Sequence, residues 1–337
     1  MGRPVTIDVA AGLAAYLGEA WGKTVTVSNL STSTSGARRH NVAFDAQVGA
    51  GGDVQRLVAT IVPFGETLIN DVDAEASVRL LAEAGGVLVP HVHLWRRDGD
   101  LVGGPFMVSD FVDGETVPRR VLRLIGEHGT GDLVAGQLGA SLGRLHALDP
   151  ADVTVPLREL DPKDPTGAAL AALVEAVDLL PQRRPAVELG LRWLERRLPS
   201  PPERVSILHT DVRNGNIIVG EDGLRAVLDW EGALAAGDPM QDLAWPSLRM
   251  WRFRVDDREI GGFADRGPYV EGYERACGTY DEERFEWWKV FETARWAVGL
   301  AAQSMAFLEG SVPSIVMAAS GRRVPELEWD LLMLIRA

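Results

Sequence analysis

The chain has 337 residues, of which 46% are hydrophobic, so it can form one large or two moderate domains with a sizeable core. Its 34 basic and 48 acidic residues give a net charge of −14, which argues against nucleic acid as a partner, because binding to phosphates needs clustered Lys and Arg. The single cysteine, Cys277, excludes an internal disulfide, and no signal-peptide pattern or transmembrane-length apolar run is present. These features predict a cytoplasmic protein without a membrane partner, and they leave the oligomeric state open.

The N-terminal part of the chain predicts one helix followed by strands. An amphipathic helix is expected near residues 5–20, and alternating patterns predict strands at 24–30 and 41–47. The Ser/Thr-rich turn between these strands contains Ser35 and Gly36, and its N–H groups and hydroxyls could hold nucleotide phosphates. An ordinary flexible hairpin would have the same composition.

The next segments predict the end of a β-rich region and the start of a helical one. A third strand is expected at 56–62, a helix at 74–84 and another strand within 105–114. Further helices are expected near 133–148, 167–180 and 186–198, and through most of 245–337. His91 and His93 are interpreted as surface polar groups, since no further metal ligands accompany them.

Residues 205–231 carry the polar groups on which the functional prediction depends. Two apolar runs, at 217–219 and 226–228, flank an Asp-Gly turn, a pattern typical of a β-hairpin. Pairing about this turn predicts Asn216 opposite Asp229 and Ile217 opposite Leu228, with Cβ atoms of a pair roughly 4.5–5.5 Å apart. A carboxylate and an amide oxygen that close can share a hard cation such as Mg²⁺.

The spacing His209-x-Asp211-x-x-x-x-Asn216 matches the catalytic loop of kinases, in which the Asp is the base and the Asn binds a metal. Asp229 then occupies the place of the second metal-binding Asp. Further on, the chain reads Gly-Asp-Pro-Met-Gln-Asp-Leu-Ala at 237–244. The sequence here resembles the aminoglycoside phosphotransferase and choline kinase-like family, whose signature reads much like LHTDVRNGNIIV and VLDWEGALAAGDPMQDLAW in this chain.

The resemblance implies an α+β, two-lobed protein-kinase-like fold. A small, β-rich, nucleotide-binding N-terminal lobe is expected at 1–111, and a larger, mostly helical lobe for catalysis and acceptor binding at 112–337. The implied reaction is Mg²⁺-dependent transfer of the γ-phosphoryl group of ATP or GTP to a hydroxyl of a metabolite or antibiotic. In this scheme Asp211 is the base, and Asn216 and Asp229 hold Mg²⁺.

The resemblance also assigns roles outside the catalytic loop. The carbonyl of Asp110 and the N–H of Val112 would bind the adenine edge, while His209 and Asp242 would have structural roles, Asp242 by bracing the catalytic loop. In the resembled family a Lys or Arg near the end of the third strand binds the phosphates and pairs with a Glu on the following helix, here Glu75.

This sequence has Thr60 at the place of that cation, which leaves Glu75 either solvated or paired with another group. If the protein is an active kinase, another cation must neutralise the phosphate charge. Arg213 is the first candidate, unless it pairs with a surface carboxylate, and Arg38 with Arg39 is the second. The alternative is a pseudokinase-like protein that binds a nucleotide or metabolite without efficient transfer.

The acceptor is not specified by the sequence. Trp230, Glu231, Arg295 and Trp296 are candidates for its pocket, because such pockets are mostly apolar and aromatic with a few placed polar groups. Arg295 and Trp296 have a plainer alternative as an internal ion pair beside a core aromatic. A cationic aminoglycoside would need several acidic groups that converge on its amines.

Overall fold

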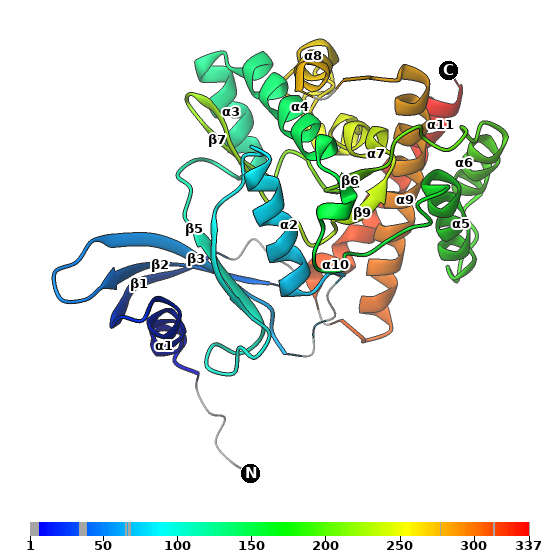
Figure 1. Ribbon diagram of the computed structural model, residues 1–337. Helices are drawn as coiled ribbons and strands as arrows, with labels where there is room; N and C mark the ends of the chain where they lie inside the picture. Colours follow the sequence, from blue (N-terminus) through cyan, green and yellow to red (C-terminus); the bar gives the residue numbers. More distant parts are fainter. Residues whose placement is uncertain are drawn as a thin grey trace.

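A computed structural model of the protein describes residues 7–33, 39–64, 66, 69–276, 278–312 and 314–336. It has the predicted α+β architecture, with a small β-rich lobe beside a larger helical lobe (Figure 1). The β-rich lobe contains α1 (Val9–Trp21), β1 (Val25–Ser33), β2 (His40–Val48), β3 (Val54–Ile61), α2 (Val72–Ala84), β4 (Val92–Arg96) and β5 (Phe106–Asp110).

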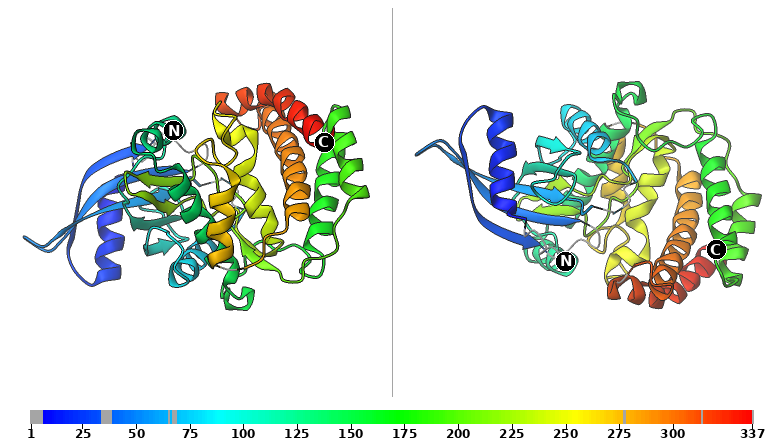
Figure 2. Two further views of the ribbon diagram at one scale, coloured as in Figure 1. Left: turned by 90° about the horizontal axis from the view of Figure 1, so that it is seen from above. Right: turned by 90° about the horizontal axis from the view of Figure 1, so that it is seen from below.

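The five strands form one antiparallel sheet in the order β1-β2-β3-β5-β4. Burial alternates along β2, where Val42, Phe44 and Ala46 face a core that they share with Leu13 and Leu17 of α1. Helix α1 accordingly lies along one face of the sheet in both views of Figure 2. The two strands predicted at 24–30 and 41–47 are present and pair as β1 and β2, but the turn between them lies outside the described residues.

The helical lobe begins with α3 (Pro118–His128), α4 (Gly131–Ala147), η1 (Pro150–Asp152), α5 (Pro165–Asp178) and α6 (Pro185–Arg196). Two short antiparallel sheets follow, one of β6 (Ser206–Leu208) with β9 (Leu234–Gly237) and one of β7 (Ile217–Gly220) with β8 (Gly223–Val227). The chain ends in α7 (Pro239–Ala244), η2 (Trp245–Ser247), η3 (Arg249–Arg252), α8 (Arg266–Ala276), α9 (Glu282–Leu308), α10 (Ile315–Ser320), η4 (Gly321–Arg323) and α11 (Val324–Arg336).

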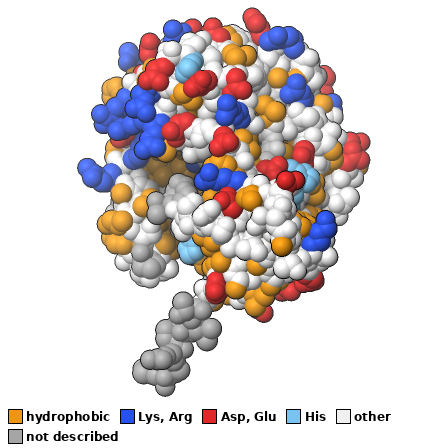
Figure 3. All heavy atoms as spheres, turned by 90° about the vertical axis from the view of Figure 1, so that its left-hand side faces the viewer, with side chains coloured by type: hydrophobic (Ala, Val, Ile, Leu, Met, Phe, Trp, Pro, Cys, Tyr) orange, Lys and Arg blue, Asp and Glu red, His pale blue; other side chains and the backbone are white. Residues whose placement is uncertain are grey.

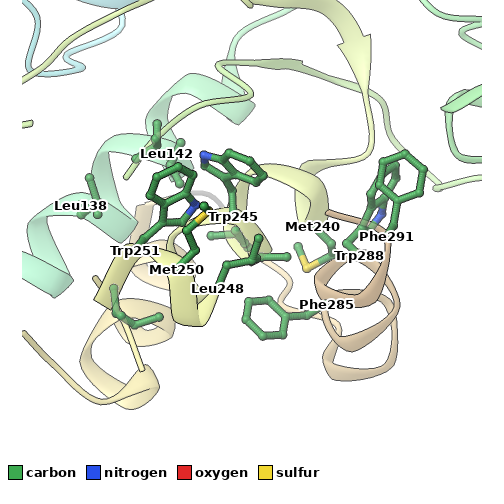
Figure 4. Packing of buried hydrophobic residues seen from close by; sticks show 14 of the residues in the cluster. Leu138, Leu142, Met240, Trp245, Leu248, Met250, Trp251, Phe285, Trp288 and Phe291 are labelled. Atoms are coloured by element: carbon green, nitrogen blue, oxygen red, sulfur yellow. The ribbon is translucent and has the colours of Figure 1, made fainter. Parts of the chain in front are cut away.

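The core of the helical lobe is built around α9, whose long apolar face packs against α7, α11 and the 3₁₀ turns that follow α7. Figure 4 shows Trp245 and Trp251 from those turns in one cluster with Phe285 and Trp288 of α9, with Leu248 and Met240 between the two groups, and all four aromatic side chains are buried. Aromatic side chains bury large areas, so this cluster fixes the position of the turn that carries Trp245.

Helices α4 and α8 approach closely because glycines line their contact. A Cβ added at Gly139 would lie 2.0 Å from the carbonyl oxygen of Tyr269, and one added at Gly272 would lie 2.0 Å from that of Gly136. This packing holds α4, which ends beneath the catalytic loop, against the rest of the lobe.

The helices and the molecular surface add two further observations. Within the described ranges, no helix is long and apolar enough to cross a membrane. The face in Figure 3 shows Lys and Arg side chains gathered along one edge, beside a hollow with apolar side chains in its wall.

Candidate functional site

The catalytic hairpin forms as β7 and β8, but its register differs from the predicted one. Ile217 pairs with Val227, not Leu228, and the Leu228 N–H donates to the carbonyl oxygen of Asn216 (2.8 Å). The turn is formed by Glu221 and Asp222, one residue earlier than the predicted Asp222-Gly223, so the pairs beside it are shifted by two positions from the prediction. A bulge at Arg225 reduces the shift to one position beyond Ile218, and Asn216 and Asp229 are therefore not direct partners.

Asp211 lies at the centre of a network of hydrogen bonds in the loop before this hairpin. Its Oδ1 accepts hydrogen bonds from Trp245 Nε1 (2.7 Å) and Arg213 Nε (3.0 Å), and its Oδ2 accepts one from Asn216 Nδ2 (2.6 Å). The guanidinium of Arg213 also lies 4.4 Å from the centroid of the Trp251 ring. The sequence therefore brings Asp211, Asn216 and Arg213 together, and Arg213 pairs with Asp211 itself in place of a remote surface carboxylate.

The loop is held from below by Asp242, a fully buried carboxylate on α7. It accepts hydrogen bonds from the backbone N–H of His209 (2.7 Å) and of Thr210 (2.6 Å), and it lies 3.2 Å from His146 Nε2. Thr210 has φ 71°, which a β-branched residue rarely adopts. Strained residues of this kind persist where surrounding contacts fix them, and Asp242 supplies such a contact.

His209 supports both ends of the hairpin from a fully buried position. Burial lowers its pKa below the ordinary value despite the nearby carboxylates of Asp242 and Asp211. In the neutral tautomer that fits the contacts, Nδ1 accepts from the Asp211 N–H (3.2 Å) and Nε2 donates to the Leu228 carbonyl (3.0 Å). The imidazole thus connects Asp211 to the residue that precedes Asp229.

Asp229 follows β8 with φ 66° and lies among other carboxylates. Burial, followed by the negative charges of Asp211 and Glu231, raises its pKa to about 7. A cation would offset this crowding, and the oxygen donors of Asn216 and Asp229 fit Mg²⁺, which often uses one or two carboxylates with substrate phosphates and waters. In the described part of the chain, no three His, Cys, Asp or Glu side chains gather as an all-protein metal cage.

The expected partner of Glu75 is missing from β3 but is supplied by the start of the neighbouring strand. Arg39 Nη1 lies 2.7 Å from Glu75 Oε2, and Arg39 Nε lies 3.0 Å from Glu231 Oε2. Burial opposes the charge on Arg39, yet Glu75 and Glu231 together raise its pKa above the ordinary arginine value. Of the two outcomes considered for Glu75, the structure shows pairing.

Thr60 and Arg39 share one face of the sheet. Thr60 lies opposite Asn41 in the β2–β3 ladder, and its hydroxyl donates to Asn41 Oδ1 (2.8 Å). Met107, the partner of Thr60 on β5, contacts Arg79 of α2, which places Thr60 on the α2 side of the sheet. Arg39 precedes β2 by one residue and contacts Glu75 of the same helix, so a positive charge is present on that side although Thr60 carries none.

The proposed adenine-binding segment lies at the end of β5. The Asp110 N–H donates to the His91 carbonyl (3.0 Å), and the Phe111 N–H donates to the Arg56 carbonyl (3.1 Å). Among the described residues, no oxygen accepts a hydrogen bond from the Val112 N–H, which leaves it available to a ligand. Ser35 and Gly36, predicted at the phosphates, lie outside the described residues.

The two histidines near this segment form surface contacts. His91 Nδ1 lies 2.8 Å from Glu83, and His93 Nε2 lies 2.6 Å from Asp110.

The acceptor candidates separate into two groups. The prediction that Trp230 lines the acceptor pocket is wrong. Its side chain is 1% exposed and packs in the core, where its Nε1 donates to the Val227 carbonyl (3.1 Å), so an acceptor cannot reach it. The carboxylate of Glu231 forms an ion pair with the guanidinium of Arg39. Arg295 pairs with Glu292, as in the plainer alternative, but Arg295 and Trp296 also line a cavity of about 530 Å³ between α5 and α9.

Sequence reasoning missed two residues that position the site. Trp245 Nε1 donates a hydrogen bond directly to Asp211 Oδ1. Asn70 donates to the carbonyls of Glu231 (3.0 Å) and Ala233 (2.8 Å). The position of Trp245 just after Asp242-Leu-Ala was the one available signal for its role, whereas nothing local marked Asn70.

Comparison with known proteins places this geometry in a family. A family model described as "Phosphotransferase enzyme family" matches residues 36–279, more than half of the chain. A Ralstonia eutropha JMP134 protein, provisionally described as an aminoglycoside phosphotransferase, is 19% identical over 97% of this chain and 98% of its own, with a TM-score of 0.69.

Two further solved structures share the fold. Aminoglycoside 2′-phosphotransferase-IIIa in its GDP complex is 12% identical over 95% of this chain and 99% of its own, with a TM-score of 0.61. Spectinomycin phosphotransferase in complex with ADP and spectinomycin is 13% identical over 97% of this chain and 98% of its own, with a TM-score of 0.59. The fold and the resemblance predicted from the sequence are confirmed, and the chain belongs to the phosphotransferase enzyme family.

Proposed function

We propose that the protein transfers the γ-phosphoryl group of ATP or GTP to a hydroxyl of a small molecule, with Mg²⁺ bound at Asn216 and Asp229. The observation that carries this proposal is the network at Asp211, in which Trp245, Asn216 and Arg213 fix both carboxylate oxygens. Fixed geometry of this kind supports proton transfer, because a general base must lie within hydrogen-bond reach of its proton.

Asp211 orients the acceptor hydroxyl and takes its proton. The hydroxyl oxygen then forms a bond to the γ-phosphorus while the bond from that phosphorus to the bridging oxygen breaks, and the nucleoside diphosphate leaves. Mg²⁺, when bound, neutralises charge on the phosphate oxygens. Trp245 and Asn216 hold the carboxylate in place, and Asp242 holds the backbone of the loop.

Arg39 is proposed as the cation that binds the nucleotide phosphates in place of the missing lysine. It is largely buried, paired with Glu75 and close to the loop of Asp229, and its Nη2 is buried without a hydrogen-bond partner among the described residues. A guanidinium that keeps its charge and has donors to spare suits phosphate oxygens. Arg213, next to the base, is proposed to contact the transferred group.

The alternative function, nucleotide or metabolite binding without efficient transfer, rested on Thr60. The Arg39–Glu75 pair weakens it, because the charge that Thr60 lacks is present on the same face of the sheet.

The test is a screen of hydroxyl compounds with Mg-ATP and Mg-GTP, read out as phosphorylated product by mass. Wild-type protein should phosphorylate at least one class, and Asp211→Asn should lose about 10²–10⁴-fold in turnover while it still binds nucleotide. Nucleotide binding without product across the panel would favour the alternative. Wild-type turnover in Asp211→Asn would exclude Asp211 as the base.

A further inference from the structure

The cavity between α5 and α9 is mostly apolar. Its volume of about 530 Å³ falls in the range of small-molecule sites. Side chains of Leu173, Phe291, Val298, Ala302 and Met305 form much of its wall. A ligand here would bury a substantial apolar body.

The charged groups in the wall are mainly positive. Arg158 and Arg295 both line the cavity, with Glu309 as the one acidic residue in the wall. Arg295 is partly neutralised by Glu292, whose other oxygen accepts a hydrogen bond from Gln241 Nε2 (2.8 Å). The set lacks the converging carboxylates that a polycationic acceptor would need.

Arg158 is the group without a counterion. Its backbone N–H donates to Asn70 Oδ1 (2.8 Å), but no ion pair or side-chain hydrogen bond joins its guanidinium to another residue that the structure describes. Partial desolvation, together with the positive charge of Arg295, lowers the pKa of Arg158 below its ordinary value, although Glu292 opposes the shift. Arg158 as a whole is exposed, so its guanidinium is open to a ligand, and an anion would pair with it as a charge-assisted hydrogen-bond acceptor.

A buried tryptophan, Trp245, lies between the cavity wall and Asp211. The guanidinium of Arg295 lies 4.6 Å from the centroid of the Trp245 ring, and Trp245 Nε1 donates to Asp211 Oδ1 (2.7 Å). Trp296 of the cavity wall also contacts Trp245, with ring centroids 5.6 Å apart. One indole therefore connects the wall to the carboxylate that would deprotonate an acceptor.

We infer that the acceptor is a hydroxyl compound with a predominantly apolar body and one anionic group, which Arg158 binds with help from Arg295. This inference rests on the proposed function and adds the acceptor class. The apolar body fills the space between α5 and α9, the anionic group sits at the two arginines, and the hydroxyl extends past Trp245 toward Asp211.

A second cavity, of about 640 Å³, has a wall in which charged side chains are as prominent as apolar ones. Its arginines Arg249 and Arg323 pair with Asp330 and Glu326, whereas Arg119 and Arg254 have no ion-pair partner among the described residues. What distinguishes the cavity between α5 and α9 is its mostly apolar wall with an unpaired arginine, Arg158, in it.

The experiment uses three matched probes: a straight-chain fatty acid with a terminal hydroxyl, and the diol and the amino alcohol of the same chain length. Binding is measured without nucleotide, by calorimetry and by quenching of tryptophan fluorescence, and phosphorylation is measured separately with Mg-ATP. We expect the hydroxy acid to bind at least about tenfold more tightly than the diol, the lower end for a hydrogen bond to a charged group. The amino alcohol should bind most weakly.

Arg158→Met should abolish the preference for the acid, and Arg158→Lys should retain part of it. Arg196→Met, which removes an exposed arginine on α6, is the matched control and should leave the preference unchanged. Equal affinities for the three probes, tighter binding of the amino alcohol, no binding of any probe, or an unchanged preference in Arg158→Met would overturn the inference. Because binding is scored without nucleotide, a charge preference without any phosphorylated product would support the acceptor class and count against the proposed transfer.

Discussion

Replacement of Arg39 by methionine tests whether the nucleotide phosphates are bound by this cation, which immediately precedes β2. Arg39 and Glu75 have side chains that are 11% and 4% exposed, with Nη1 and Oε2 2.7 Å apart. Breaking a buried pair on one side leaves an uncompensated charge and costs about 3–5 kcal/mol of stability. Arg39→Met alone would therefore combine a folding effect with a binding effect.

The background Glu75→Gln removes that complication, because it eliminates the carboxylate that would be left unpaired. In this background, Arg39→Met should weaken Mg-ATP binding by about 1.5–3 kcal/mol, the range for hydrogen bonds to charged groups, which is roughly 10- to 100-fold in Kd. Adenosine, which has no phosphates, should bind as before. Calorimetry with both ligands separates the two cases.

Two further variants complete the design. Thr60→Lys added to Arg39→Met should recover part of the lost affinity, since diagonal neighbours on one sheet face are about 7–8 Å apart, within reach of a long side chain. Arg96→Met, at a partly exposed arginine of β4 that pairs with Glu19, is the control and should have no effect. If Arg39→Met leaves Mg-ATP binding unchanged, or weakens adenosine to the same extent, Arg39 is not the phosphate-binding cation.

Three other predictions concern acidic residues of the candidate site and the core. Asp229→Ala should weaken Mg-ATP binding far more than adenosine binding in calorimetry, and equal losses would remove the metal assignment. Asp242→Ala should destabilise the protein by roughly 2–6 kcal/mol in urea unfolding, because two buried N–H groups lose their acceptor at about 1–3 kcal/mol each; a loss below about 1 kcal/mol would contradict its bracing role. Burial raises the pKa of Glu292, so the folded state binds its proton more readily than the unfolded chain, and wild-type stability should fall as pH rises from about 4.3 upward. The glutamine of Glu292→Gln cannot ionise, so the Tm of this variant minus the Tm of the wild type should increase from pH 4.5 to pH 8. A difference in Tm that stays constant would refute this prediction.

The fold was predictable because local patterns and one long motif agreed. The strands and helices expected from periodicity form with shifted ends, and the stretch around Asp211 and Asp242 carried enough specific residues to identify the family. The hairpin register was not predictable to one residue, because the turn forms at Glu221-Asp222 and not at the Asp-Gly pair, and the bulge at Arg225 leaves no clear signal in the apolar pattern.

The partners of the site residues were harder to predict, since they come from distant positions. Arg39 meets Glu75 across 36 residues, and Trp245 meets Asp211 across 34. Such contacts depend on how β2 lies against α2 and how the turn after α7 packs on α9, which a single sequence does not specify. The unpaired charge of Arg158 is likewise a property of the packed helices.

The contact between Arg39 and Glu231 has a consequence for how a nucleotide would enter. It joins the sheet lobe to the loop after Asp229, with Nε and Oε2 3.0 Å apart. A phosphate that reaches Arg39 must displace this carboxylate, so entry is an exchange of one anion for another. The measured nucleotide affinity then reports the free energy of the Arg39–phosphate pair minus that of the Arg39–Glu231 pair. Because salt weakens both pairs, this affinity should fall less steeply with ionic strength than the affinity of an unpaired guanidinium for phosphate. Loss of the carboxylate in Glu231→Gln would remove the competitor, so this part of the site trades nucleotide affinity for a defined arrangement of the two lobes before the nucleotide arrives.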